Sequence, residues 1–207
     1  MTQRKILLDC GTHFGEGLDA FILKFNVDSS WIVHTFEANP ATFYQFERNQ
    51  IPSKYTGRKR IDYVTYHNEA ISTKNSTVLL NIETHPDEDF NHTGQGTSII
   101  SLDQWNPHNG GTKKFFNYCC NVPCIHFSEF IMKNFKRDDF IVIKMDIEGE
   151  EYNVLEDMIS SDVISWIDYI AVEFHAQHFT NSQEMKLREE SIIQILKDKN
   201  IHYELWD

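Results

Sequence analysis

Several acidic side chains and one histidine directly follow short apolar runs of this sequence, the position that ligand-binding groups take in many α/β proteins. Carboxylates accept hydrogen bonds from paired hydroxyls and attract cations, and an imidazole exchanges protons near neutral pH. Such groups are suited to hold a hydroxylated or cationic ligand and to take a proton from an acceptor. The residues are Asp9, Glu37, Asp146, Glu148, Glu173 and His175.

Two kinds of chemistry are open to this set. Asp146 and His175 are candidate general bases for a hydroxyl acceptor, a role that typically contributes about 10²–10⁴-fold in rate. Alternatively, the acids would bind Mg²⁺, which lowers the pKa of a bound hydroxyl. Acids at neighbouring strand ends repel one another unless a cation lies between them. The candidate ligands of such an ion are Asp146, Glu148, Glu173 and His175.

A glycine-rich turn follows the first apolar run and precedes an amphipathic segment. Gly11, Gly15 and Gly17 have the spacing Gly-x-x-x-Gly-x-Gly, with Asp9 before them and Glu16 among them. Glycines serve where a backbone turns tightly or approaches a ligand closely. Two carboxylates would repel a pyrophosphate, so the turn disfavours a nicotinamide dinucleotide and favours S-adenosylmethionine, which carries a sulfonium and an ammonium group. An ordinary turn without a ligand stays an alternative.

Apolar runs separated by amphipathic segments predict the elements that position these groups. The run 140–145, which ends at Asp146, is apolar nearly throughout, as expected for a central parallel strand covered on both faces. The sequence therefore predicts an α/β fold with a doubly wound, mostly parallel, Rossmann-like sheet. Further strands are expected at 5–9, 31–36, 61–67, 77–82, 122–127, 169–175 and 202–206.

The domain organisation is expected to be simple, with one domain over residues 1–207. The segments 83–97 and 106–121 are rich in polar and turn-forming residues and are expected to be loop or lid insertions. No antiparallel seventh strand is evident at the end of the sequence, so we expect the sheet to lack it. Either the sheet is minimal, or a partner covers its open edge, or the sequence is a trimmed form; a homo-oligomer is compatible with the second alternative.

Charge and hydropathy narrow the class of partner. The formal charge of −12 argues against a nucleic acid held by its phosphates and is better suited to a neutral or cationic small molecule or saccharide. No apolar run approaches the ~20 residues of a membrane span. The N-terminal segment has no apolar core of a secretion signal. We therefore expect no membrane partner and a cytoplasmic location.

A cluster of sulfur and imidazole side chains lies in the middle of the chain. Cys119, Cys120 and Cys124 with His126 resemble a zinc motif, but adjacent cysteines are poorly placed to bind one ion together. The alternation of Val122, Cys124 and His126 instead predicts a strand that carries Cys124 inward.

Four sequence blocks together resemble the FkbM family of S-adenosylmethionine-dependent methyltransferases. They are Asp-Cys-Gly-Thr-His-Phe-Gly at 9–15, Phe-Glu-Ala-Asn-Pro at 36–40, Lys-Met-Asp-Ile-Glu-Gly-Glu-Glu at 144–151 and Val-Glu-Phe-His at 172–175. The third block is the most specific to the family. The resemblance implies a class I methyltransferase fold and O-methyl transfer to a hydroxyl of a sugar or small metabolite. A module that binds the cofactor without catalysis is the alternative.

The resemblance also implies a cofactor site, residue by residue. Glu37, in the same block as Asn39, would hold the ribose, and Asp146 would lie beside the methyl group. The residues expected near the adenine are Asn68, Glu69 and Ala70, and those expected at the methionine end are Asp9, Gly11, Thr12, His13 and Gly15.

Overall fold

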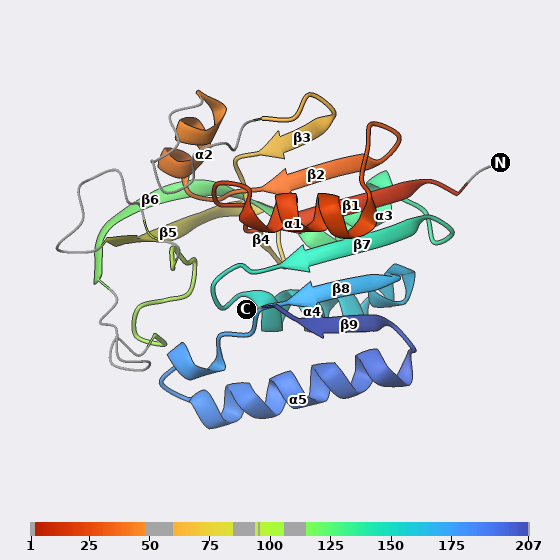
Figure 1. Ribbon diagram of the computed structural model, residues 1–207. Helices are drawn as coiled ribbons and strands as arrows, with labels where there is room; N and C mark the ends of the chain where they lie inside the picture. The colour runs from red at the N-terminus through yellow and green to blue at the C-terminus, as the bar shows by residue number, and fades with distance from the viewer. Residues whose placement is uncertain (1–2, 49–59, 85–93, 95, 106–114, 207) are drawn as a thin grey trace.

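The main element of the structure is a parallel sheet of six strands in the order β3-β2-β1-β7-β8-β9 (Figure 1). The computed structural model describes residues 3–48, 60–84, 94, 96–105 and 115–206. The strands of this sheet are β1 (Lys5–Cys10), β2 (Ile32–Phe36), β3 (Val64–His67), β7 (Phe140–Met145), β8 (Tyr169–Val172) and β9 (His202–Leu205).

The two central strands, β1 and β7, are buried on both faces. Alternate side chains of β1 enter two separate cores: Leu7 packs with one cluster, and Ile6 and Leu8 pack with the other. Successive side chains of a strand point to opposite faces, so a continuous apolar run is needed where helices cover both. This is why the sequences of these two strands are apolar over most of their length.

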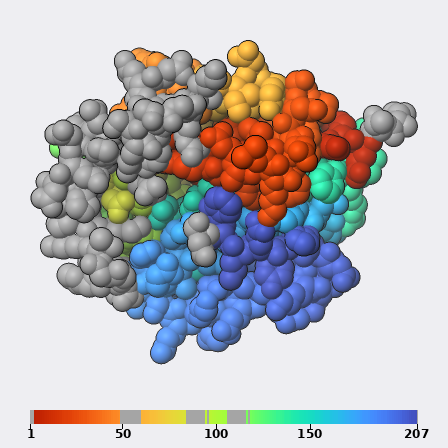
Figure 2. All heavy atoms as spheres, viewed as in Figure 1, coloured from red at the N-terminus to blue at the C-terminus, as the bar shows by residue number. Residues whose placement is uncertain are grey.

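Helices cover both faces of the sheet. On the face nearer the viewer in Figure 1, α1 (Glu16–Phe25) packs Leu18 and Phe21 on the sheet, and in Figure 2 its atoms (red) meet the end of the chain (dark blue). Lys24 of α1 bonds Glu204 there. The opposite core receives side chains from α3 (Phe127–Asn134), α4 (Glu151–Ser160) and α5 (Ser182–Asp198). The other helices of the described residues are α2 (Pro40–Glu47) and the short turns η2 (Val163–Trp166) and η3 (Ala176–His178).

A second sheet of three strands, in the order β4-β6-β5, lies beyond the carboxyl ends of the main strands (Figure 1). Its strands are β4 (Ala70–Ser72), β5 (Ser76–Thr84) and β6 (Phe115–His126). The expectation that 106–121 is a loop is therefore wrong for residues 115–121, and 83–84 belong to β5. Residues 85–93, 95 and 106–114 of the two expected insertions lie outside the described residues.

The reason for this error is the pairing of β6. Its residues from Tyr118 to Cys124 pair antiparallel with β5. This strand supplies hydrogen-bond partners for the main chain of β6 that no local sequence pattern predicts. Towards its end the strand alternates as expected, with Val122 and Cys124 buried against Leu80. The predicted strand with Cys124 inward is thus confirmed for residues 122–126, as the last part of a longer one, whereas Phe127 already begins α3.

The predicted doubly wound, Rossmann-like α/β architecture is confirmed. Within the described part of the chain the main sheet has no antiparallel strand, as the sequence indicated. The strand expected at 169–175 ends at Val172, so Glu173 and His175 stand just beyond it. Among the described residues, no helix is both long and apolar enough to cross a membrane.

A pair of histidines on β2 and β3 makes the stability of the sheet depend on pH. His34 Nδ1 lies 2.8 Å from His67 Nε2. Burial, with repulsion from His67, lowers the pKa of His34 to about 4, below the ~6.5 of an unfolded chain. The unfolded state therefore takes up the proton first as pH falls. The stability this group contributes is complete above pH ~6.5 and is lost as pH falls toward 4.

Between pH 7 and pH 4.5, the parent chain and the variant His34→Gln should lose different amounts of unfolding free energy. We expect the loss to be about 1–2 kcal/mol larger in the parent chain, a value that is reduced for the partial exposure of the ring. Urea denaturation at the two pH values measures the difference. Equal losses in both proteins would contradict the assignment to His34.

Candidate active site

A cleft of about 530 Å³ opens where β1, β2, β7 and β8 end. In Figure 1 the arrowheads of the main sheet all point to the side of the molecule on which β5 and β6 lie. Leu80 and Glu83 of β5 line the cleft from that second sheet, as do Thr97 and Ile99 of the following segment. The cleft is thus bounded by strand ends on one side and by β5 on the other, the usual position of a ligand in an open parallel sheet.

The glycine turn after β1 touches the loop after β7. A Cβ on Gly11 would lie 1.7 Å from the main-chain oxygen of Asp146, and the Gly11 φ is +79°. The amides of Gly11 and Thr12 both donate to the Phe36 carbonyl at 3.0 Å. Only a glycine tolerates both the left-handed conformation and this approach. These hydrogen bonds and this close contact therefore hold the ends of β1, β2 and β7 together at the cleft.

Glu37, directly after β2, has its carboxylate fixed by two main-chain amides. Oε2 accepts from the His13 amide at 2.8 Å, and Oε1 accepts from the Asn39 amide at 2.7 Å. Burial raises the pKa of Glu37, while the nearby His13 and the two amide donors act in the opposite direction. Each oxygen has a further lone pair, so the carboxylate can accept two more hydrogen bonds from a ligand in the cleft.

A buried ammonium group stands at the floor of the cleft. The Lys144 Nζ donates to the Gly11 carbonyl at 2.7 Å and to Asp146 Oδ2 at 3.1 Å, and it lies 3.8 Å from Asp9 Oδ1. Burial alone would lower the pKa of Lys144, but Asp146 and Asp9 raise it above its usual value. Lys144 therefore carries a positive charge that joins the glycine turn to two acids.

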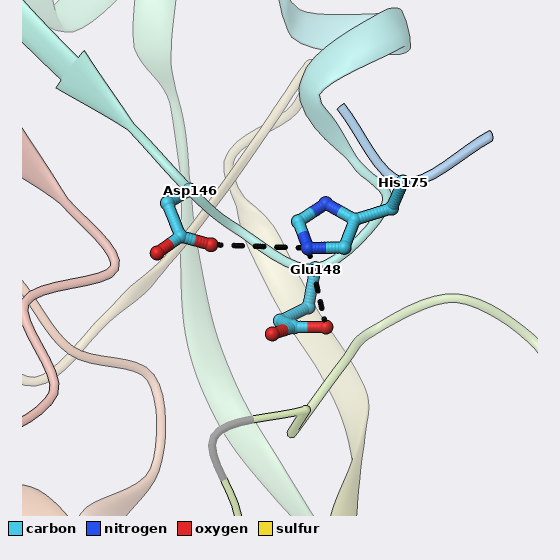
Figure 3. A group of neighbouring side chains, drawn as sticks. All are labelled: Asp146, Glu148 and His175. Carbon is cyan, nitrogen blue, oxygen red and sulfur yellow. Dashed lines mark ion pairs between the residues drawn. The ribbon is translucent and has the colours of Figure 1, made fainter. Parts of the chain in front are cut away.

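His175, beyond β8, points into a group of carboxylates (Figure 3). Its Nε2 lies 3.5 Å from Glu148 Oε2, 3.9 Å from Asp146 Oδ1 and 3.6 Å from Glu173 Oε1. Its Nδ1 lies 3.0 Å from Glu151 Oε1. Burial by itself lowers the pKa of His175, but attraction by Glu151 and Glu148 outweighs it and raises the pKa to about 10.

The loop that carries Glu148 is held in an unusual conformation. Glu148 has φ +54° and Gly149 has φ +107°. The carboxylate of Glu151, which is fully buried, accepts from the amides of Ile147 and Gly149, each at 2.9 Å. Left-handed backbone at a residue with a side chain persists only where surrounding contacts enforce it, and it is frequent at functional sites. Here Glu151 supplies the contacts that present Glu148 to the cleft.

The structure brings most of the predicted site residues together. Four of them stand behind the lining: Gly15 in the turn, Asn39 as the cap of α2, Asn68 bonded to the Glu37 carbonyl, and Asp9 beneath Lys144. The predicted residues that line the cleft are Gly11, Thr12, His13, Glu37, Glu69, Ala70, Asp146, Glu148, Glu173 and His175.

Sequence reasoning missed two residues that organise the site. Lys144 is the one charge inside the apolar run 140–145, and that isolation was the available signal. Glu151 falls within the specific block 144–151, but its role as acceptor of two loop amides and a histidine depends on the loop conformation. Neither contact follows from residue type or spacing.

The fold and the site place the chain in the doubly wound, Rossmann-like class of ligand-binding α/β proteins. The features that define this class are a parallel sheet, a glycine turn after its first strand, an acid after its second strand and a cleft at the strand ends. Residues 9–203 match the Methyltransferase FkbM domain. The chain therefore belongs to the FkbM methyltransferase family, as the sequence blocks indicated.

A solved structure titled methyltransferase FkbM from Methylobacillus flagellatus KT is similar at 15% identity with a TM-score of 0.48, over 93% of this chain and 37% of the other. This chain thus corresponds to little more than a third of that protein's length. No protein with curated annotation matched.

Proposed function

We propose that the chain is an S-adenosylmethionine-dependent methyltransferase that methylates a hydroxyl of a sugar or small metabolite. The observation that carries the proposal is the Glu37 carboxylate, anchored at the end of β2 by the amides of His13 and Asn39. It lines the same cleft as Asp146. A carboxylate with two lone pairs left over is the group that binds the two hydroxyls of a ribose.

The other features of the cleft fit this cofactor. Its volume of about 530 Å³ is within the usual range of small-molecule sites, about 300–1,000 Å³. Gly11 lines the cleft, where the family resemblance implies the methionine end of the cofactor. Acids outnumber cations around the opening, which suits a ligand that bears a sulfonium and an ammonium. The acidic lining also favours a neutral or cationic acceptor over a phosphorylated one.

The cofactor supplies a methyl group on a good leaving group, so the protein's task is to align the acceptor and accept its proton. Alignment can supply about 7–11 kcal/mol of the barrier. Without a bound cation, a His175 imidazole with a pKa of about 10 keeps both ring protons near neutral pH and donates rather than accepts. Asp146, held by Lys144 through Oδ2, is then the group that takes the acceptor's proton.

Binding of S-adenosylmethionine tests the proposal. We expect calorimetric titration to show micromolar binding, with no binding of NAD. Glu37→Gln should weaken binding by about 10–100-fold, because one charge-assisted hydrogen bond contributes about 1.5–3 kcal/mol. Glu47→Gln is the control, since Glu47 lies on α2 in an exposed pair with Arg60.

A change in the ligand separates a ribose contact from general damage to the loop. S-adenosylhomocysteine and its 2′-deoxy analogue should differ in affinity for the parent chain and bind Glu37→Gln almost equally. A folded parent chain that does not bind S-adenosylmethionine would overturn the proposal. Binding without turnover on any hydroxylated acceptor would favour a module that only binds the cofactor.

A further inference from the structure

Three side chains at the mouth of the cleft form a set of metal-ligand type. One donor atom from each of Asp146, Glu148 and His175 lies within 4.8 Å of the others (Figure 3). Two ligand atoms on opposite sides of one cation are about 4.6 Å apart when the bonds are about 2.3 Å long. The three donors are therefore spaced to share a single cation after small side-chain movements.

The imidazole is already oriented for this role. Glu151 Oε1 faces His175 Nδ1 at 3.0 Å, and the amides of Ile147 and Gly149 also bond the Glu151 carboxylate. A carboxylate so engaged is an acceptor, so the proton of the contact is on Nδ1. A metal-binding histidine characteristically donates its other ring N–H to a carboxylate in this way.

The second ring nitrogen is aimed at the carboxylates. His175 is only 2% exposed, and its Nε2 lies 3.5 Å from Glu148, 3.9 Å from Asp146 and 3.6 Å from Glu173. In the metal-free chain these contacts are ion pairs with the protonated ring. A bound cation would take the place of the Nε2 proton between the same donors, because a metal-binding imidazole is neutral.

Asp146 is fixed in the orientation that such a cation needs. Its Oδ2 accepts from the Lys144 ammonium at 3.1 Å, so Oδ1 is the oxygen that faces His175. Glu148 is held toward the same point by its left-handed backbone and by the Ser98 hydroxyl, which donates to its main-chain oxygen at 2.5 Å. All three donors are thus positioned by contacts outside the set.

We propose that Asp146, Glu148 and His175 bind a divalent first-row cation, best matched by Mn²⁺, and that Glu151 is the positioning residue for His175. Carboxylates suit Mg²⁺ and Mn²⁺, but an imidazole ligand favours a transition metal over Mg²⁺. Binding itself does not depend on the proposed methyl transfer. The cation would also bind the acceptor oxygen and lower its pKa, and this second role rests on the proposed function.

Manganese titration of the metal-free chain, without S-adenosylmethionine, tests the site. After treatment with a chelator, electron paramagnetic resonance of free Mn²⁺ should show one saturable site. His175→Gln and Glu148→Gln should each weaken it at least ~10-fold, and Glu151→Gln by about 10–100-fold. Glu156→Gln, which removes an exposed acid of α4, should leave the affinity unchanged.

Pulsed resonance of the bound ion covers the case in which a variant fails to fold. The parent chain with Mn²⁺ should show the ¹⁴N modulation of one imidazole. No saturable binding up to millimolar Mn²⁺, or binding without ¹⁴N modulation, overturns the site. Displacement of Mn²⁺ by S-adenosylmethionine also overturns it, because the sulfonium would then be the cation between the acids.

The same samples distinguish the two proposals. S-adenosylmethionine that binds equally well in the presence of a chelator supports the proposed function whatever the metal result. Mn²⁺ that binds to a chain with no affinity for S-adenosylmethionine supports the metal site and removes the proposed function.

Discussion

Lys144→Met is expected to lower the free energy of unfolding by about 3–5 kcal/mol, the usual result of removing one partner from a buried charge pair. Lys144 is 3% exposed, and its ammonium lies between Asp146 and the fully buried Asp9. Neither carboxylate oxygen of Asp9 has a hydrogen bond among the described residues. Burial raises the pKa of Asp9, and the charge of Lys144 is the main influence that lowers it. Without Lys144, Asp9 is an unpaired buried acid.

Chemical denaturation measures this loss, and a second substitution shows its origin. Asp9→Asn combined with Lys144→Met removes both charges, so the double variant should recover about 1–3 kcal/mol relative to the sum of the single changes. Lys199→Met serves as the control, since the exposed pair of Lys199 with Asp162 contributes at most ~1 kcal/mol. A Lys144→Met protein as stable as the parent would show that Asp9 is neutral and needs no cation.

Gly11→Ala is expected to cost about 3 kcal/mol or more and to weaken binding of S-adenosylmethionine at least ~10-fold. The substitution combines two penalties. The φ of +79° is unfavourable for any residue with a side chain, and the new Cβ would lie 1.7 Å from the Asp146 carbonyl oxygen. That oxygen belongs to the main chain, so relief requires the loop after β7 to move and to take the Asp146 side chain with it.

Gly15→Ala separates these two penalties. Gly15 has a similar φ of +90°, but a Cβ there would meet only the Phe46 ring at 3.6 Å, an ordinary contact. It should therefore show only the conformational cost, about 1–2 kcal/mol. Thermal unfolding and calorimetry with S-adenosylmethionine provide both readouts. Equal losses for the two variants would mean that the contact between the glycine turn and the loop after β7 is unimportant.

Local sequence was enough for the central framework. The run of β7 is apolar except for Lys144, and it can be satisfied only where both faces are covered, so its place in the middle of a parallel sheet followed from composition. Glycines at 11 and 15 indicated a tight turn, and both have positive φ. Asn39 caps α2 and Pro40 begins it, an arrangement that local sequence favours at a helix start.

Elements that depend on partners distant in sequence were not predictable in the same way. β6 extends back to Phe115 because β5 pairs with it, although turn-forming residues precede it. The start of α3 is capped by His126 through the Glu129 amide, whereas Ser128 donates to Asp157 of α4. The local sequence predicts that a serine near a helix start caps that helix, but the Ser128 hydroxyl bonds Asp157 of the neighbouring helix α4 instead.

The sequence by itself determined the fold class, the glycine turn and the set of acids at the strand ends, because strand periodicity and backbone freedom are properties of neighbouring residues. Only the tertiary structure decided which acids face the cleft. Asp9 is placed beneath Lys144, while Glu148 is directed into the cleft by a loop that Glu151 holds. Those outcomes depend on charges and amides that meet across strands, and a strand-end position specifies an edge of the sheet but not the contacts made there.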